Sequence, residues 1–218
     1  MALAIFDLDN TLLNGDSDYL WGQFLAQQGH VDATHYEKEN QRFYDEYVAG
    51  TLDIFEFLEF SLAPLSQMDM SELELLHNRF MDECIRPVIT TKSRALIQKH
   101  ADQNDTLLII TATNLFITAP IAEELGIPNI LATDPEVIDN RYTGKVFGTP
   151  CFKDGKVERL KTWLKETGDN LADSYFYSDS HNDLPLLELV KKPVAVDPDE
   201  TLRSHAEMKG WEIISLRD

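Results

Sequence analysis

The sequence predicts an α/β protein with a Rossmann-like parallel sheet core and an inserted helical cap subdomain. Short apolar runs alternate with helix-like stretches through most of the chain, and a long stretch without clear strands follows the first run. Polar residues, several of them acidic, come after three of the runs. Strands that alternate with helices are typical of a parallel sheet covered on both faces. The polar strand ends indicate a site at one edge of that sheet.

Short apolar runs are predicted to be buried strands, because runs of this length bounded by polar or turn residues fit a fully covered sheet. They are "LAIF" (3–6), "LLII" (107–110), "SYFY" (174–177), "PVAV" (193–196) and "EIIS" (212–215). Two intervening stretches, 115–126 and 155–168, have apolar residues at helical spacing and end in glycine, a common helix stop. Within "IDNRYTGKVFG" we expect a hairpin that turns at Thr143–Gly144.

Residues 16–85 are predicted to form the cap, and residues 1–15 together with 86–218 the core. The cap segment is rich in aromatic and acidic residues with helical periodicity and contains no clear strand, so four or so helices are expected. A strand reaches a parallel neighbour only through a crossover connection. This crossover is long enough to build a helical subdomain at the carboxyl end of the first strand.

Length and charge limit the classes of function. The chain has 218 residues, which suits one α/β core with an inserted subdomain. Its formal net charge of -19 repels nucleic acid and anionic lipid, so we expect neither as a partner. The two cysteines lack metal-site spacing, no basic segment opens the chain, and no apolar run is long enough to span a bilayer, so a cytoplasmic protein is expected. The sequence does not determine the oligomeric state.

Polar side chains stand where three of the predicted strands end. Asp7 and Asp9 follow the first run, Thr111 follows the second, and Asp179 stands shortly after "SYFY". Residues i and i+2 of a strand point to the same side, so Asp7 and Asp9 repel each other unless a cation or a shared proton compensates. Because ligands of open α/β sheets bind beyond the carboxyl ends of the strands, these side chains are expected to share one site.

These residue types fit the transfer of a phosphoryl group. Mg²⁺ prefers hard oxygen ligands and keeps part of its water shell, and Asp7, Asp179 and a backbone carbonyl near Asp9 supply such oxygens. Lys156, the Thr111 hydroxyl and backbone N–H groups of the first loop supply charge and donors for a phosphate. Asp7 is then placed to attack phosphorus as a carboxylate nucleophile. Asp9 is placed to protonate the leaving oxygen and later to deprotonate a water.

Four stretches resemble the four motifs of the haloacid dehalogenase-like phosphatases: "FDLDNT", "IITATN", "GKVERL" and "YSDSHNDLPLL". They span almost the whole chain, and the insertion after the first motif resembles the cap of the branch that contains phosphoserine phosphatase (subfamily IB). The resemblance implies Asp7 as a nucleophile that forms an aspartyl-phosphate and Asp9 as general acid/base and metal ligand. It also implies phosphate contacts at Asn10, Thr111, Ala112 and Lys156, a magnesium ligand at Asp179, and support from Asn182 and Asp183.

Two positions in these motifs need comment. Lys153 is a rival for the phosphate-binding lysine, but Lys156 is preferred because Leu160, four residues on, gives the spacing usual in the family. The fourth motif usually has glycine before its first acid, and this chain has Ser178 there.

The cap is expected to select the substrate. Phosphoserine phosphatases carry a glutamate nine residues after the nucleophile that pairs with the substrate amine, and this chain has Asp16 there. They also carry a cap arginine that grips the substrate carboxylate. By alignment from Gly50, that position falls on Ser61. The cap thus offers an acid that can pair with a substrate amine, but no arginine that can pair with a substrate carboxylate. This combination favours an amino-alcohol phosphate as the substrate.

Histidinol phosphate is such a compound, and the chain also resembles the short histidinol-phosphatase-type members of this branch, which implies a role in amino-acid biosynthesis. Phosphoserine is the alternative substrate. A receiver-like phospho-acceptor is disfavoured, because receivers place the phosphorylated aspartate on a later strand than the acidic pair and have no helical insertion. A binding protein without catalysis is disfavoured too, since every candidate catalytic side chain is present.

Overall fold

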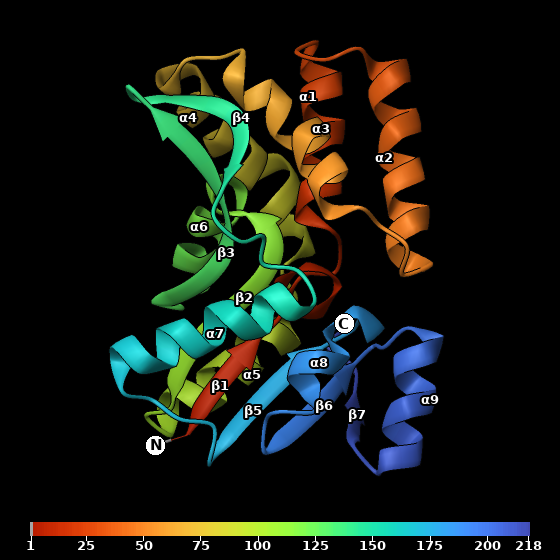
Figure 1. The fold of residues 1–218 in the computed structure, drawn as a ribbon, viewed down its shortest axis with the longest axis vertical. Helices are drawn as coiled ribbons and strands as arrows, with labels where there is room; N and C mark the ends of the chain where they lie inside the picture. Colours follow the sequence, from red (N-terminus) through yellow and green to blue (C-terminus); the bar gives the residue numbers. More distant parts are fainter. Residues whose placement is uncertain (1) are drawn as a thin grey trace.

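A computed structural model describes residues 2–218, within which seven strands form one sheet in the order β4-β3-β2-β1-β5-β6-β7 (Figure 1). The antiparallel pair is β3 with β4, and the other neighbouring strands are parallel. The expected α/β fold with a largely parallel sheet is confirmed. The strands are β1 (Leu3–Phe6), β2 (Thr106–Asn114), β3 (Asn129–Ile138), β4 (Arg141–Phe147), β5 (Ser174–Ser178), β6 (Lys192–Val196) and β7 (Glu212–Ile214).

The first strand lies at the centre of the sheet and is buried on both faces. Phe6 stands opposite Ile109 of β2 and Tyr177 of β5 in the parallel register. Ala4 and Phe6 belong to one hydrophobic cluster, whereas Leu3 and Ile5 belong to another. This division follows from side chains that alternate between the faces of a strand. It explains why the run is apolar at every position.

Helices cover both faces of the sheet. On the face of Phe6 lie α5 and α6, and on the face of Ile5 lie α7, α8 and α9. The stops expected at Gly126 and Gly168 are present: both glycines follow their helix in the left-handed region, with φ of 70° and 79°. The bounds are α5 (Thr91–Asp102), α6 (Leu115–Glu124), α7 (Asp154–Thr167), α8 (Leu184–Leu187) and α9 (Glu200–Lys209).

Four helices, called the cap helices here, lie between β1 and α5 in the sequence: α1 (Ser17–Gln28), α2 (Ala33–Val48), α3 (Ile54–Ser66) and α4 (Met70–Phe80). Each begins after an aspartate whose side chain accepts a hydrogen bond from the first turn, namely Asp16, Asp32, Asp53 and Asp69. Their aromatic core includes Trp21 and Phe80 and is continuous with the cluster under Phe6. The cap helices therefore share a core with one face of the sheet.

The hairpin expected near residue 143 is present, but its turn was placed wrongly. The chain reverses between β3 and β4 at Asp139 and Asn140, which have φ of 49° and 58°. Asp and Asn tolerate this left-handed conformation, and two such residues form the tight turn that suits a twisted hairpin. Gly144 lies inside β4, where an added Cβ would be 3.4 Å from Ser66 of α3. Its φ of 79° lies in the left-handed region that glycine adopts without strain.

The second strand is longer than its apolar run. It continues to Asn114, so Thr111 lies within the strand and does not follow it. The pairing with β3 shifts register between Ile110 and Asn114. The polar end of β2 lies at the same edge as the end of β1 because these two strands are parallel.

Gly155, in the first turn of α7, should not tolerate a side chain. An added Cβ would lie 2.1 Å from the carbonyl oxygen of Pro150. We expect Gly155→Ala to lower the free energy of unfolding by about 1–3 kcal/mol, as overpacking does, measured by urea denaturation. At Gly15 the nearest neighbour of an added Cβ would be 3.5 Å away, so Gly15→Ala is the matched control and should change stability little. Equal stability of the two variants would contradict this account.

Candidate active site

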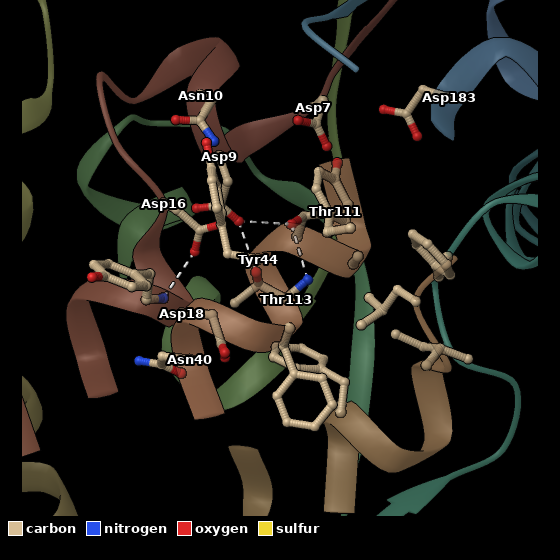
Figure 2. Close-up of a pocket in the computed structure, with 18 of the residues that line it drawn as sticks. Asp7, Asp9, Asn10, Asp16, Asp18, Asn40, Tyr44, Thr111, Thr113 and Asp183 are labelled. Carbon is tan, nitrogen blue, oxygen red and sulfur yellow. Dashed lines mark hydrogen bonds between the residues drawn. The ribbon is translucent and has the colours of Figure 1, made fainter. Parts of the chain in front are cut away.

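The carboxyl ends of β1, β2 and β5 bring the predicted residues together. After β1 the chain turns sharply through residues 8–12, with Asn10 at a φ of 54° and its backbone N–H donating to the Gly15 carbonyl at 2.9 Å. This turn leaves Asp7 buried at the edge of the sheet, 6% exposed. Asp7, Asp9, Asn10 and Thr111 line one cavity with Lys156 and Asp183. Figure 2 shows this cavity.

Lys156 joins two of the buried carboxylates. Its ammonium lies 2.8 Å from Asp7 Oδ1 and 2.8 Å from Asp183 Oδ1, and the residue is 3% exposed. The rival lysine lies elsewhere, because Lys153 Nζ donates to the carbonyl of Gly50 in the cap segment at 2.8 Å. Ser178 donates its hydroxyl to Asp183 Oδ2 at 2.7 Å. A glycine, usual at that position, lacks the side chain for this bond.

Asp179 is linked to Asp7 by Thr11, whose hydroxyl contacts both carboxylates. The Thr11 hydroxyl lies 3.0 Å from Asp179 Oδ1 and 3.3 Å from Asp7 Oδ2, and it accepts a bond from the Asp179 N–H at 3.0 Å. Burial raises the pKa of Asp7 to about 7 although Lys156 opposes the shift. Burial and the charges of Asp7 and Asp183 also raise the pKa of Asp179. Lys156 pairs with Asp7 and Asp183, and Asp179 adds a third carboxylate beside Asp7, so the group is short of positive charge.

This donor set fits a magnesium ion. Asp7 and Asp179 offer carboxylate oxygens and the chain after Asp7 offers backbone carbonyls, and Mg²⁺ takes few protein ligands and retains water. Within residues 2–218, no three side chains of His, Cys, Asp or Glu are arranged as a complete metal cage. A site of two carboxylates and one carbonyl does not require such a cage.

Asp9 is held between the sheet and the cap helices. Its Oδ1 accepts from the backbone N–H of Ser17 at 2.6 Å, and its Oδ2 accepts from the Thr113 hydroxyl at 2.7 Å. Thr111 also points its hydroxyl toward Asp9 Oδ2, at 3.4 Å. Burial, together with the nearby charge of Asp16, raises the pKa of Asp9 to about 6. A carboxyl with this pKa is suited to give and take a proton near neutral pH.

The remaining predicted residues differ in what they contact. Asp16 lines the cavity and also caps α1, since its Oδ1 accepts from the Tyr19 N–H at 2.9 Å. Ala112 lines the cavity as well. Asn182 does not: its Nδ2 donates to the Tyr47 carbonyl at the end of α2, at 3.1 Å. It links the loop after β5 to the cap helices.

Sequence reasoning missed several residues of the site. Thr113 had a signal, because it is two residues after Thr111 and so faces the same side of β2. Asp18 and Asn40 also line the cavity. They carry no local pattern, since their meeting depends on how α1 and α2 pack.

The cavity walls combine acids with aromatic rings. Of the lining residues within 2–218, Lys156 is the only basic one. The acids that line it are Asp7, Asp9, Asp16, Asp18 and Asp183, and the aromatic residues are Tyr19, Phe43, Tyr44, Tyr47, Phe57 and Phe152. Such a cavity favours a ligand that is anionic at the Lys156 end and cationic elsewhere.

Substituting each of the two lysines should show which one supports catalysis. Lys156→Met removes the only ammonium from the carboxylate group, so we expect release of phosphate from an aryl phosphate to fall at least ~100-fold, as when a preorganised donor is lost. Lys153→Met, the matched control, removes a contact to the Gly50 carbonyl and should cost less than ~10-fold. Circular dichroism of both variants checks folding. A larger loss in Lys153→Met would reverse the assignment.

Comparison with known proteins agrees with this geometry. A family model described as haloacid dehalogenase-like hydrolase matches residues 4–188. A histidinol-phosphatase of Neisseria meningitidis serogroup C is 49% identical over 219 residues, covering 99% of each chain. Phosphoserine phosphatase SerB1 of Mycobacterium tuberculosis is 34% identical over 99% of this chain and 71% of its own.

Solved structures show the same fold. A Bordetella pertussis Tohama I protein of unknown function superimposes with a TM-score of 0.93 at 44% identity, over 99% of each chain. A substrate-bound phosphoserine phosphatase superimposes with a TM-score of 0.73 at 20% identity, over 99% of this chain and 93% of that one. The chain belongs to the haloacid dehalogenase-like hydrolases.

Proposed function

We propose that the protein is a magnesium-dependent phosphatase that hydrolyses a small amine-bearing phosphate ester, with histidinol phosphate as the substrate. One observation carries the proposal: the cavity that holds Asp7, Asp9 and Lys156 has further acids on its walls and, within residues 2–218, no arginine. The first three residues suit a phosphate ester, and the walls suit a cation. The name of the Neisseria relative supports the same substrate.

The first step is attack by a carboxylate oxygen of Asp7 on phosphorus. The bond from phosphorus to the ester oxygen breaks, and that oxygen takes the proton of Asp9, which the raised pKa of about 6 helps to retain. Lys156, the Thr111 hydroxyl and backbone N–H groups of the first loop hold the phosphoryl oxygens. The products of this step are the free alcohol and an aspartyl-phosphate at Asp7.

The second step releases phosphate. Asp9, now a carboxylate, takes a proton from a water that attacks the phosphorus of phospho-Asp7. The bond between phosphorus and the Asp7 oxygen breaks, which restores the carboxylate and frees inorganic phosphate. A magnesium ion held by Asp7, Asp179 and the Asp9 carbonyl would supply the positive charge that this carboxylate group lacks.

The substrate assignment rests on charge. Asp16 is proposed to bind the substrate amine, as its place on the cavity wall allows. Ser61, expected at the position of the carboxylate-binding arginine, is instead buried in α3, 3% exposed, and does not line the cavity. Two arginines of the cap segment, Arg42 and Arg79, could otherwise bind a substrate carboxylate, but neither lines the cavity. Arg42 pairs with Glu39, Glu46 and Glu56, and Arg79 pairs with Glu83. A phosphoserine carboxylate would therefore lack a partner.

We further propose that α1–α4 act as a cap, residues 16–85, over a core of residues 1–15 and 86–218. Two contacts support closure between them: Asn182 Nδ2 to the Tyr47 carbonyl at 3.1 Å, and Lys153 Nζ to the Gly50 carbonyl at 2.8 Å. A closed cavity excludes water from the reacting phosphate.

We propose a cytoplasmic place in amino-acid biosynthesis, in keeping with the name of the Neisseria relative and the free thiols of Cys84 and Cys151. The net charge of -19 disfavours nucleic acid as a partner. Residues 2–218 contain no helix that is both long and apolar enough to span a bilayer.

A panel of esters tests the proposed function. With magnesium present, histidinol phosphate should have a kcat/KM at least ~10-fold above that of phosphoserine, because a buried carboxylate without a partner costs several kcal/mol. Asp7→Asn is nearly isosteric and should remove turnover of every ester. Faster hydrolysis of phosphoserine would favour the second candidate, phosphoserine phosphatase, which the name of SerB1 represents. Activity retained in Asp7→Asn would place the nucleophile elsewhere.

The same panel tests the amine contact. Asn caps helices as well as Asp, so Asp16→Asn keeps the start of α1 and removes only the charge. It should lower kcat/KM for histidinol phosphate by about 10- to 100-fold, the range of a lost charge-assisted hydrogen bond. The loss for an aryl phosphate, which has no amine, should be much smaller. Equal losses would make Asp16 a structural residue of the cap.

A further inference from the structure

Two polar residues of the cavity take no part in the mechanism above. Asp18 lies in the first turn of α1 and Asn40 in α2, and both line the cavity. In Figure 2 they lie on the side opposite Asp7 and Asp183, with Asp9 and Asp16 in between. The cavity therefore extends from the phosphate end, past Asp16, to the polar pair formed by Asp18 and Asn40.

Both side chains are largely buried, yet both line the cavity. Asn40 is 6% exposed. Asp18 is 9% exposed, and its carboxylate accepts a long bond from Asn114 Nδ2, at 3.4 Å. Neither residue contributes to the fully buried side-chain atoms that lack a partner within residues 2–218. Their polar atoms are therefore open to the cavity, where a ligand can bond to them.

The packing of α1 on α2 creates this pair. Gly22 of α1 faces α2, and a Cβ added there would lie 2.6 Å from Asn40 Nδ2 and 2.4 Å from the ring of Tyr36. Any larger residue at position 22 would hold the two helices apart. The close approach therefore brings the amide of Asn40 to the side of the cavity where Asp18 lies.

Asp18 differs from Asp16 in what it is free to bind. Asp16 already accepts a hydrogen bond from the Tyr19 N–H, at 2.9 Å, while Asp18 accepts none from the backbone of its helix. Burial and the charges of Asp16 and Asp9 raise the pKa of Asp18. A carboxyl in this state is suited to share a proton with a nitrogen base.

We propose that Asp18 and Asn40 form a subsite for a second nitrogen group of the substrate, an imidazole that lies farther from the phosphate than the amine. This inference rests on the proposed function and deepens it. An imidazole ring offers one N–H donor and one nitrogen acceptor, which match the Asp18 carboxylate and the Asn40 amide. The rings of Phe43 and Phe57 on the cavity wall provide apolar contact for its faces.

Substrates that differ only in the distal group test the subsite. The comparison uses histidinol phosphate, which has an amine and an imidazole, and phosphoethanolamine, which has the amine alone. Asp18→Asn and Asn40→Ala should each lower the ratio of kcat/KM for the first ester over the second by about 10-fold or more. Asp16→Asn should leave that ratio nearly constant because both esters carry the amine. Asp45→Asn, an exposed acid of α2 outside the cavity, is the control and should change neither ester.

A binding measurement keeps the inference separate from the proposed function. Calorimetry should detect histidinol, the free amino alcohol, binding to the unmodified protein and binding about 10-fold or more weakly to Asp18→Asn. Thermal unfolding should show Asp18→Asn at least as stable as the unmodified protein, since a structural role would lower its melting temperature. Unchanged histidinol affinity, or a loss equal for both esters, overturns the subsite. A failure of the unmodified protein to hydrolyse histidinol phosphate while histidinol still binds overturns the proposed function alone.

Discussion

The site depends on an imbalance of charge: the carboxylates of Asp7, Asp179 and Asp183 gather around a site that holds one ammonium, that of Lys156. Asp7, Asp179 and Asp183 meet at the ends of β1 and β5 because the parallel register places Phe6 beside Tyr177. Lys156 Nζ lies 2.8 Å from both Asp7 and Asp183. Like charges at such range are unfavourable in a buried setting unless positive charge is added. We propose that a divalent cation, which binds together with the phosphate of the substrate, supplies this charge.

The second acid of the first motif connects this chemistry to the cap helices. Asp9 accepts from Ser17 at the start of α1 and from Thr113 at the end of β2. The cap aromatic cluster is also continuous with the core under β1. The proposed general acid, Asp9, and two of the residues proposed to select the substrate, Asp16 and Asp18, are therefore all positioned by α1. We infer that changes in how α1 packs alter both proton transfer and selectivity.

Much of this organisation is readable from the chain. Every predicted apolar run became a strand, because burial on both faces demands apolar residues at each position. The residues after those runs share one edge because parallel strands end together. Asp7 and Thr111 were expected at this edge for this reason, although β2 extends past its apolar run and contains Thr111. Lys156, which lies in α7, was expected instead from the family motif and its spacing to Leu160.

The position of the hairpin turn and two residues of the cavity could not be predicted, because they depend on tertiary packing. The hairpin turns at Asp139 and Asn140, where two left-handed residues are tolerated, and the more conspicuous Gly144 lies inside β4 with a φ of 79°. No local pattern marks Asp18 and Asn40, since they meet only when α1 and α2 approach across Gly22. When two helices together line a cavity, the residue spacing within either helix does not predict which side chains will meet there.

Titration calorimetry with magnesium measures whether the carboxylate group needs a cation. We expect the unmodified protein to bind about one ion per chain, and we expect excess chelator to stop phosphate release until magnesium is restored. Asp179→Asn should abolish binding, whereas Asp173→Asn, an exposed acid at the opposite end of β5 that pairs with Lys192, should not. Full activity in excess chelator, or unchanged binding in Asp179→Asn, would contradict the claim that the carboxylate group needs a cation.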